Sequence, residues 1–256
     1  MARAAIEIKG LDELKRGLTT LQQEKYPSAM RNAINYTLAD VKTATVARMH
    51  IDFKSPTPFT QKSMKVEEAS KTKLSGRVVF KDPTRLSESQ HYLYPNTYGV
   101  KRGHKPFESA LYRKGIIKNG WYAVPGRGVQ LDGYGNVPAS LYVQILAFFD
   151  AFPELGSKQN MTDATRARRK RGTKKKYGFE YFALKNPNGS MLPGIYKRTY
   201  TGFGTAIDAM FIFVPPSHVW YTRQYKFHET GVDVFRAKFK PYFGSEMDKL
   251  LQESFK

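Results

Sequence analysis

Hydrophobic residues recur at helical spacing in the N-terminal part of the chain. In the segment 11–23, leucines at 11, 14, 18 and 21 predict an amphipathic helix. Pro27 is expected to interrupt it. A longer helix is then predicted from Ser28, which is a suitable N-cap, to Phe53. Together they predict a helical hairpin over 1–53. The apolar stripe of the longer helix is Met30, Ile34, Leu38, Val41, Thr45 and Met49.

Shorter patterns follow this hairpin. The prolines of "SPTPF" are expected to end the long helix, and residues 54–152 combine strands with helices. The aromatic, turn-rich segment 91–106 is predicted as strand and loop. The remaining predictions are strands at 5–10, 75–82 and "WYAVPGRG", a helix at 106–115 between Pro106 and Gly115, and a helix at 137–152.

The C-terminal part, 179–256, is predicted as strands followed by a helix. Three β-type segments, 177–185, 192–200 and 206–214, are separated by the turns "NPNGS" and "TGFGT". A helical stripe then runs from Val232 to Leu251, and Pro241 and Gly244 are expected to kink or split that helix. Helices, a mixed middle, strands and a final helix predict an α+β fold, which we expect to form one domain over 1–256.

A strongly basic stretch separates the predicted elements. The segment 153–178 has few apolar residues and is predicted as a long basic loop or arm. It is our candidate for contact with nucleic acid or an acidic partner. It contacts phosphates in a sequence-blind, salt-sensitive way, or it is a solvated, self-repelling loop. Its basic residues are Arg166, Arg168, Arg169, Lys170, Arg171, Lys174, Lys175 and Lys176.

Composition extends this picture to the whole chain. The 256 residues carry a net charge of +20, and the chain remains basic without the run. Such a charge attracts polyanions, and DNA, RNA, an acidic protein and an anionic membrane surface all fit. Cysteine is absent, so no disulfide or thiol chemistry is expected. No apolar stretch predicts a membrane span or a secretory signal, and we expect synthesis in a cytoplasm.

No pattern predicts an enzyme, a cofactor or a metal site. The glycines of "GRGVQLDGYG" fit neither phosphate-loop spacing, and the acidic residues at 82, 132, 150 and 208 lie in unrelated contexts. Basic and aromatic residues interleave in "HYLYPNTYGVKRGHK" and "GIYKRTYTGF". Such mixtures stack bases and hold phosphates, or form strand pairs with one solvated face. The histidines are scattered, at His50, His91, His104, His218 and His228.

Several long motifs resemble a family of tailed-phage virion proteins. The segment "YPSAMRNAINYTLADVKTATVARM" resembles the N-terminal helix of minor tail protein Z-like, tail-completion proteins. Six further motifs resemble phage and prophage virion proteins in the same order and extend over most of the chain. They are "YLYPNTYGVKRGHKPFESAL", "GWYAVPGRGVQLDGYGN", "YVQIL", "LPGIYKR", "MFIFV" and "YKFHETGVDVFRAKFKPYF".

The resemblance implies a non-enzymatic structural protein of the phage neck or tail. Such a protein joins or completes the tail at the head–tail junction, as part of a homo-oligomeric ring around the DNA channel. Its implied partners are other tail, neck or portal proteins, with possible nonspecific contact to packaged DNA, and its location is the virion after assembly in the host cytoplasm. The alternative hypothesis is a sequence-nonspecific nucleic-acid-binding accessory protein.

Overall fold

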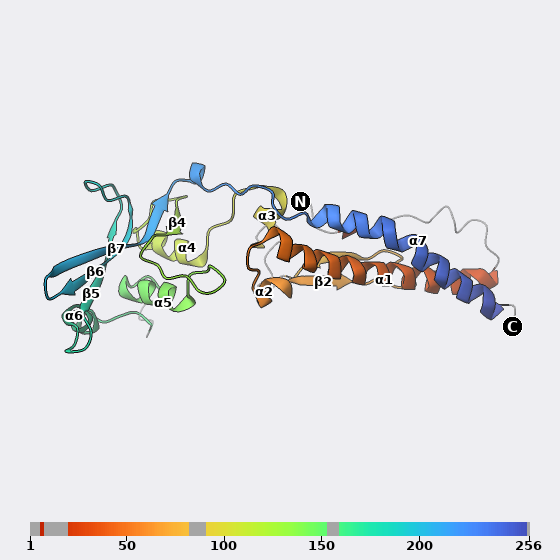
Figure 1. Cartoon of the computed structure of the whole chain (residues 1–256), viewed down its shortest axis with the longest axis horizontal. Helices are drawn as coiled ribbons and strands as arrows, with labels where there is room; N and C mark the ends of the chain where they lie inside the picture. Colours follow the sequence, from red (N-terminus) through yellow and green to blue (C-terminus); the bar gives the residue numbers. More distant parts are fainter. Residues whose placement is uncertain (1–5, 8–19, 82–90, 153–158, 255–256) are drawn as a thin grey trace. The chain divides into compact units, whose positions relative to one another are not determined.

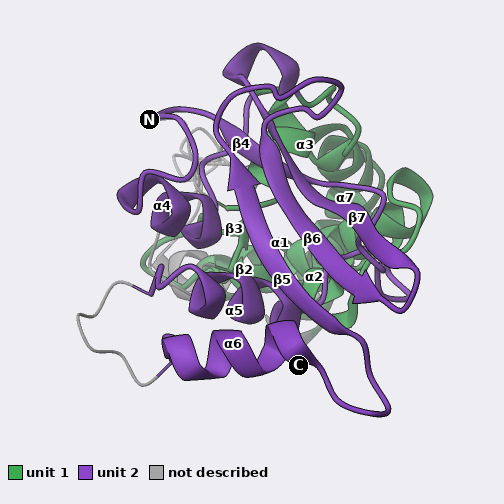
Figure 2. Ribbon diagram, turned by 90° about the vertical axis from the view of Figure 1, so that its left-hand side faces the viewer, with its two compact units in different colours: residues 1–100, 221–256 green, residues 101–220 purple. Residues whose placement is uncertain are grey.

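The protein combines helices with antiparallel sheets, which confirms the predicted α+β class. A computed structural model describes residues 6–7, 20–81, 91–152 and 159–254. One domain was predicted over 1–256, whereas the chain divides into two compact units (Figure 2). Unit 1 is formed within residues 1–100 and 221–256, and unit 2 is formed by residues 101–220.

Unit 1 is built on two long antiparallel helices, α1 (Thr20–Asp52) and α7 (Phe227–Ser254), which lie side by side (Figure 1). Near one end of the pair, the ring of Tyr26 meets that of Phe243 edge-on at 6.1 Å. Near the other end, Asp52 accepts a hydrogen bond of 3.0 Å from the backbone amide of Lys226. These contacts fix the direction of both helices.

A small antiparallel sheet and two short helices complete unit 1. The strand order is β1-β3-β2, so the predicted N-terminal edge strand is confirmed. The predicted strand 75–82 is confirmed over its central residues, 77–80. The elements are β1 (Ile6–Glu7), α2 (Pro58–Gln61), β2 (Met64–Glu67), β3 (Arg77–Phe80) and α3 (Tyr94–Tyr98).

The apolar stripe predicted for the long helix is confirmed as the centre of the unit 1 core. All six of its residues, from Met30 to Met49, are fully buried. They pack with Val78 and Phe80 of β3 and with Phe227 of α7. The threonine in the stripe satisfies its own hydroxyl, because Thr45 Oγ1 donates to the backbone carbonyl of Val41 at 2.8 Å.

Two local predictions were wrong, one at Pro27 and one over 91–106. Helix α1 passes through Pro27 without ending there. A proline removes one backbone donor, but Tyr26 and Met30 on either side of it are both buried in the core, and this packing outweighs the local cost. The first helix of the predicted hairpin lies mostly outside the described residues. Helix α7 is one element across Pro241 and Gly244, so it is not split in two there, and the kink expected as the alternative stays a prediction. The segment 91–106 contains a helix, α3, and no strand.

Unit 2 is organised around a four-stranded antiparallel sheet of order β4-β7-β6-β5. The three predicted C-terminal strands form a meander with the hairpin turn at "TGFGT", and "WYAVPGRG" supplies the fourth strand, all as predicted. The strands are β4 (Tyr122–Pro125), β5 (Gly178–Leu184), β6 (Gly194–Thr201) and β7 (Gly204–Val214).

Helices α4 (Pro106–Arg113) and α5 (Ala139–Phe148) pack on one face of this sheet. Phe107 of α4 contacts Tyr142 of α5 and Phe211 of β7, each with ring centroids 4.9 Å apart. The predicted helix 106–115 is confirmed with Pro106 in its first turn, and the predicted helix 137–152 is shorter than expected. A 3-10 turn, η3 (Pro216–His218), ends the unit. None of the helices described for the chain is long and apolar enough to cross a membrane.

Candidate functional site

The basic run is folded, which corrects the prediction of a long loop or arm over 153–178. Residues 163–171 form helix α6 (Asp163–Arg171), while 153–158 lie outside the described residues. Thr162 caps the helix by accepting a bond of 3.3 Å from the amide of Thr165. The helix dipole favours a negative charge at the N-terminus and positive charges at the C-terminus. Asp163 lies in the first turn and four basic residues lie in the last turn, so both ends are stabilised. Gly172 follows with a φ of 73°, a conformation that favours glycine.

Two of the eight basic residues hold α6 against the rest of unit 2. Arg166 donates from Nε to the backbone carbonyl of Phe148 at 2.8 Å and pairs with Asp150 at 2.7 Å. Lys170 pairs with Glu180 of β5 at 3.0 Å. The helix is therefore tied to α5 at one side chain and to the edge strand of the sheet at another.

The backbone also fits closely where α6 meets β5. A Cβ added to Gly178 would overlap the carbonyl oxygen of Lys170. Only glycine permits this approach, because any larger residue needs space that the helix occupies. The packing of α6 on β5 is therefore specific to this pair of elements.

We expect Gly178→Ala to displace α6 and to destabilise unit 2 by about 1–3 kcal/mol, the usual cost of overpacking. Gly202→Ala is the matched control, because a Cβ at Gly202 meets nothing within 4 Å. Urea unfolding and amide exchange of residues 166–171 measure the effect. Equal stability and equal exchange in the two variants would show that α6 does not pack here.

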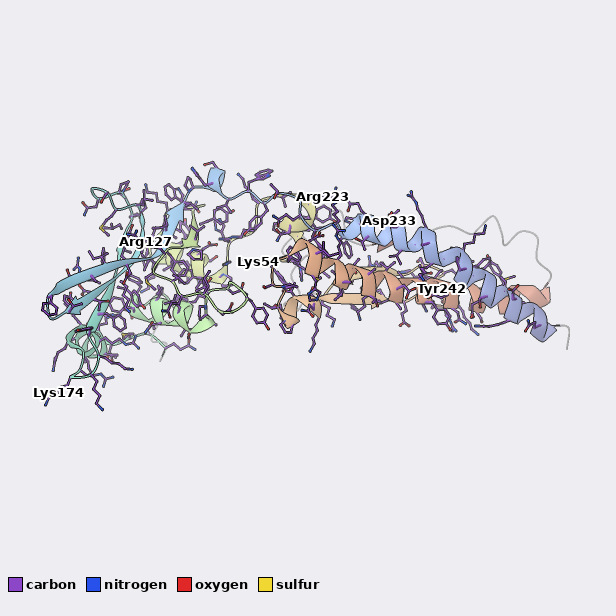
Figure 3. All side chains as sticks on the ribbon, in the orientation of Figure 1. Lys54, Arg127, Lys174, Arg223, Asp233 and Tyr242 are labelled. Atoms are coloured by element: carbon purple, nitrogen blue, oxygen red, sulfur yellow. The ribbon has the colours of Figure 1, made fainter. Side chains whose placement is uncertain are left out.

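The other six basic residues have no carboxylate within ion-pair distance in the part of the chain that the structure describes. We call them the α6 cations, and they lie on α6 and on the turn that joins it to β5. In that turn the backbone amide of Thr173 donates to the carbonyl of Lys176 at 2.9 Å. Figure 3 shows the labelled Lys174 side chain pointing away from the ribbon. The α6 cations are Arg168, Arg169, Arg171, Lys174, Lys175 and Lys176.

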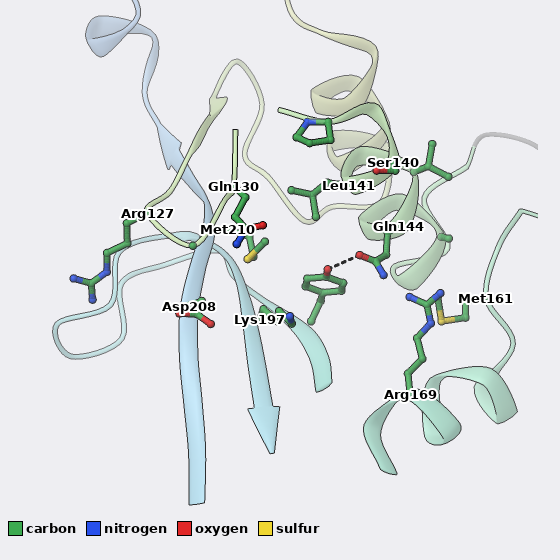
Figure 4. A pocket seen from close by; sticks show the side chains of 15 residues that line it. Arg127, Gln130, Ser140, Leu141, Gln144, Met161, Arg169, Lys197, Asp208 and Met210 are labelled. Atoms are coloured by element: carbon green, nitrogen blue, oxygen red, sulfur yellow. Dashed lines mark hydrogen bonds between the residues drawn. The ribbon is translucent and has the colours of Figure 1, made fainter. Parts of the chain in front are cut away.

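A groove of about 970 Å³ lies next to α6, between α5, α6 and the sheet (Figure 4). We call it the α5–α6 groove. Arg169 of α6 and Lys197 of β6 line it, and neither has an ion-pair partner among the described residues. Arg127 also belongs to the rim, but its side chain points away from the centre in Figure 4. Asp208 is the acidic residue of the lining.

The ring of Phe179 lies beside both cations, and a tyrosine–glutamine hydrogen bond lies in the same groove. The guanidinium of Arg169 lies 5.9 Å, and the ammonium of Lys197 4.7 Å, from the ring centroid of Phe179. The hydroxyl of Tyr181 donates to Oε1 of Gln144 at 2.8 Å. Burial raises the pKa of Tyr181 to about 12, so this hydroxyl keeps its proton at neutral pH.

The opposite face of the sheet carries charges that are already matched. Glu180 pairs with Lys170 and with Arg198 at 3.1 Å, and it accepts a hydrogen bond from the hydroxyl of Tyr200. Burial opposes the charged form of Glu180, but these bonds outweigh burial and hold its pKa below the ordinary value. Arg198 therefore contributes less free positive charge than Lys197, its neighbour in sequence.

Sequence reasoning missed a buried ion pair in unit 2. Glu108 of α4 is 1% exposed. It accepts bonds from both terminal nitrogens of Arg102, at 2.5 and 2.8 Å, and from the amides of Ala123 at 2.9 Å and Lys105 at 2.7 Å. Burial opposes its charge, but these donors hold the pKa of the carboxyl below its usual value. Because both oxygens are saturated, Glu108 anchors α4 to β4.

The structure does not bring the scattered histidines into one site. No group of three His, Asp or Glu side chains that could hold a metal ion occurs within residues 20–81, 91–152 and 159–254.

The segment "HYLYPNTYGVKRGHK" runs from unit 1 into unit 2, while "GIYKRTYTGF" forms β6 and its turn. The carboxylate candidate at 82 lies outside the described residues.

Comparison with protein-family models, with curated proteins and with solved structures finds no match to this chain. The phage-virion role therefore stays a prediction from the quoted motifs.

Proposed function

We propose that the protein is a non-enzymatic structural protein of a tailed-phage virion, which completes or joins the tail as part of a homo-oligomeric ring. Its unit 2 contacts a polyanion through the α6 cations. The ordered motifs support the virion role. The observation that carries the polyanion contact is the separation of the basic run into two anchoring residues and six cations that have no carboxylate partner among the described residues.

This separation argues for a binding surface because unpaired like charges on one short segment repel each other. Their repulsion is relieved when an external polyanion neutralises them, with release of counterions. Two sources of that charge suit a neck or tail protein, namely packaged DNA and an acidic segment of a neighbouring protein.

Purified particles test the virion role. We expect mass spectrometry of tailed virions to find the chain in a fixed multiple per particle, and particles lacking it to contain filled heads without joined tails. Absence of the chain from purified virions, with normal tails in a strain that lacks it, would refute this role.

The second candidate is a sequence-nonspecific nucleic-acid-binding accessory protein. It is favoured by aromatic rings that lie beside basic side chains on the other face of the sheet. The ammonium of Lys170 lies 5.5 Å from the ring centroid of Tyr200, and the guanidinium of Arg198 lies 4.8 Å from that of Phe182, although both basic groups also pair with Glu180. Salt-steep duplex binding by the monomer, together with absence from virions, would select this candidate over the first.

A further inference from the structure

Arg169 differs from the other α6 cations because its guanidinium is partly enclosed. Its Nη1 atom is buried and has no hydrogen-bond partner within the part of the chain that the structure describes. Buried charged donors in folded proteins are normally paired, because an unpaired one retains the full cost of losing water. None of the described residues accepts a hydrogen bond from this atom, and the Arg169 side chain lines the α5–α6 groove, where an external acceptor can approach its guanidinium.

The groups beside Arg169 are also donors. The ammonium of Lys197 has no carboxylate partner among the described residues, and it faces the same groove (Figure 4). Gln144 uses its amide oxygen to accept from Tyr181, which leaves its Nε2 as a donor on the groove side. Asp208, the cross-strand neighbour of Lys197, is the one carboxylate among the described residues that line the groove. The centre of the groove therefore favours an anionic ligand whose atoms accept hydrogen bonds and donate none.

We propose that the α5–α6 groove is a phosphate-binding site, in which Arg169, Lys197 and Gln144 donate to the phosphate oxygens. The planar fork of an arginine matches two oxygens of one phosphate, and a lysine adds a point charge. This inference names the ligand of the polyanion contact proposed above and rests on that proposal.

The same geometry indicates which part of a nucleotide the groove contacts. The ring of Phe179 is already covered by Arg169 and Lys197, and Tyr181 is buried. The groove therefore offers no open ring on which a base stacks, so recognition is by the phosphate and is blind to sequence. The remaining α6 cations continue beyond the groove, which suits the repeated charges of a nucleic-acid backbone.

A residue placed for a ligand is not required for the fold. We expect Arg169→Gln to keep the melting temperature of the free protein or to raise it, because the change removes a buried donor that has no partner. A lower melting temperature would mean that Arg169 supports the fold and would overturn the assignment.

The site is tested by measuring how tightly the protein binds a fluorescein-labelled oligothymidylate of twelve nucleotides. Fluorescence anisotropy at constant ionic strength reports this binding. We expect Arg169→Gln and Lys197→Gln each to weaken binding about tenfold, the loss of a charge-assisted contact. Arg168→Gln is the matched control, with the same charge change on an exposed neighbour in α6. It should weaken binding only about twofold, through general electrostatics.

Inorganic pyrophosphate distinguishes the two sources of phosphate. If it raises the melting temperature of the wild type and not of Arg169→Gln, while oligothymidylate binding is unchanged by that substitution, the site takes free phosphates. Equal effects of Arg168→Gln and Arg169→Gln on both probes would overturn the site and leave the polyanion contact intact. If neither phosphate probe binds the wild type, the phosphate site is refuted, and if a twelve-residue glutamate peptide does not bind either, the polyanion contact fails with it. Tighter Arg169-dependent binding of a twelve-residue glutamate peptide would assign the groove to carboxylates instead.

Discussion

Replacing Glu108 with glutamine is expected to lower the free energy of unfolding of unit 2 by about 3–5 kcal/mol, the cost of breaking a buried ion pair. Glutamine has nearly the same shape, but its amide group would turn a donor toward Arg102 or toward the amides of Ala123 and Lys105. The guanidinium of Arg102 would also lose its counter-charge. Such a loss is a large part of the stability of a typical domain.

Urea unfolding of the full chain, with separate probes for the two units, measures this effect. Glu229→Gln in unit 1 is the matched control, since Glu229 pairs with Arg223 at 2.5 Å and both side chains are nearly half exposed. An exposed pair contributes about 0–1 kcal/mol. A similarly small effect of Glu108→Gln would contradict its role as the anchor of α4.

The same residue predicts how unit 2 responds to acid. Because the pKa of Glu108 is lowered in the folded state, its contribution to stability is fully present above the unfolded pKa of about 4.3. It is lost as the pH falls through the folded pKa. We expect the stability of unit 2 to fall with pH in that range in the wild type. The fall should be shallower in Glu108→Gln. Identical profiles in the two proteins would argue against a charged Glu108.

Neutralising all six α6 cations to glutamine is expected to abolish tight polyanion binding without unfolding unit 2. Counterion release contributes a slope of about −0.9 in log K against log salt for each duplex phosphate neutralised. The slope should therefore become shallower by up to ~5 when six contacts are removed. Arg166 and Lys170 are left unchanged, because they anchor the helix.

A variant with six exposed lysines of unit 1 changed to glutamine carries the same charge and serves as the control. We expect it to keep most of the affinity and the slope of the wild type. Equal losses in the two variants would show that net charge alone, and not the α6 surface, governs binding. The control positions are Lys42, Lys54, Lys62, Lys71, Lys73 and Lys238.

The sequence predicted those elements whose pattern is set by burial. The stripe from Met30 to Met49 lies in the core because one helix face is covered along its length. The break at Pro27 was wrong, because a local penalty was weighed without the packing on either side of it. That packing depends on α7, which lies far away in the sequence.

The basic run shows the opposite kind of error. Its composition indicated a loop, yet the run is flanked by helix signals. Thr162 is an N-cap residue, Asp163 is an acidic residue in the first turn, and Gly172 ends the helix. Those signals were present in the sequence and outweigh the repulsion of the charges. The groove could not be predicted, because Gln144, Arg169 and Lys197 come from three elements whose contact is decided by the fold of unit 2.

The central claim is that the basic run is a helix already packed on unit 2 before any partner binds, with two anchors and six cations available. Hydrogen exchange of the backbone amides of residues 167–172 in the free protein tests it most directly. We predict measurable protection that is reduced by Gly178→Ala and unaffected by Gly202→Ala. Exchange at the rate of an unstructured chain in the wild type would contradict the claim and restore the mobile basic arm.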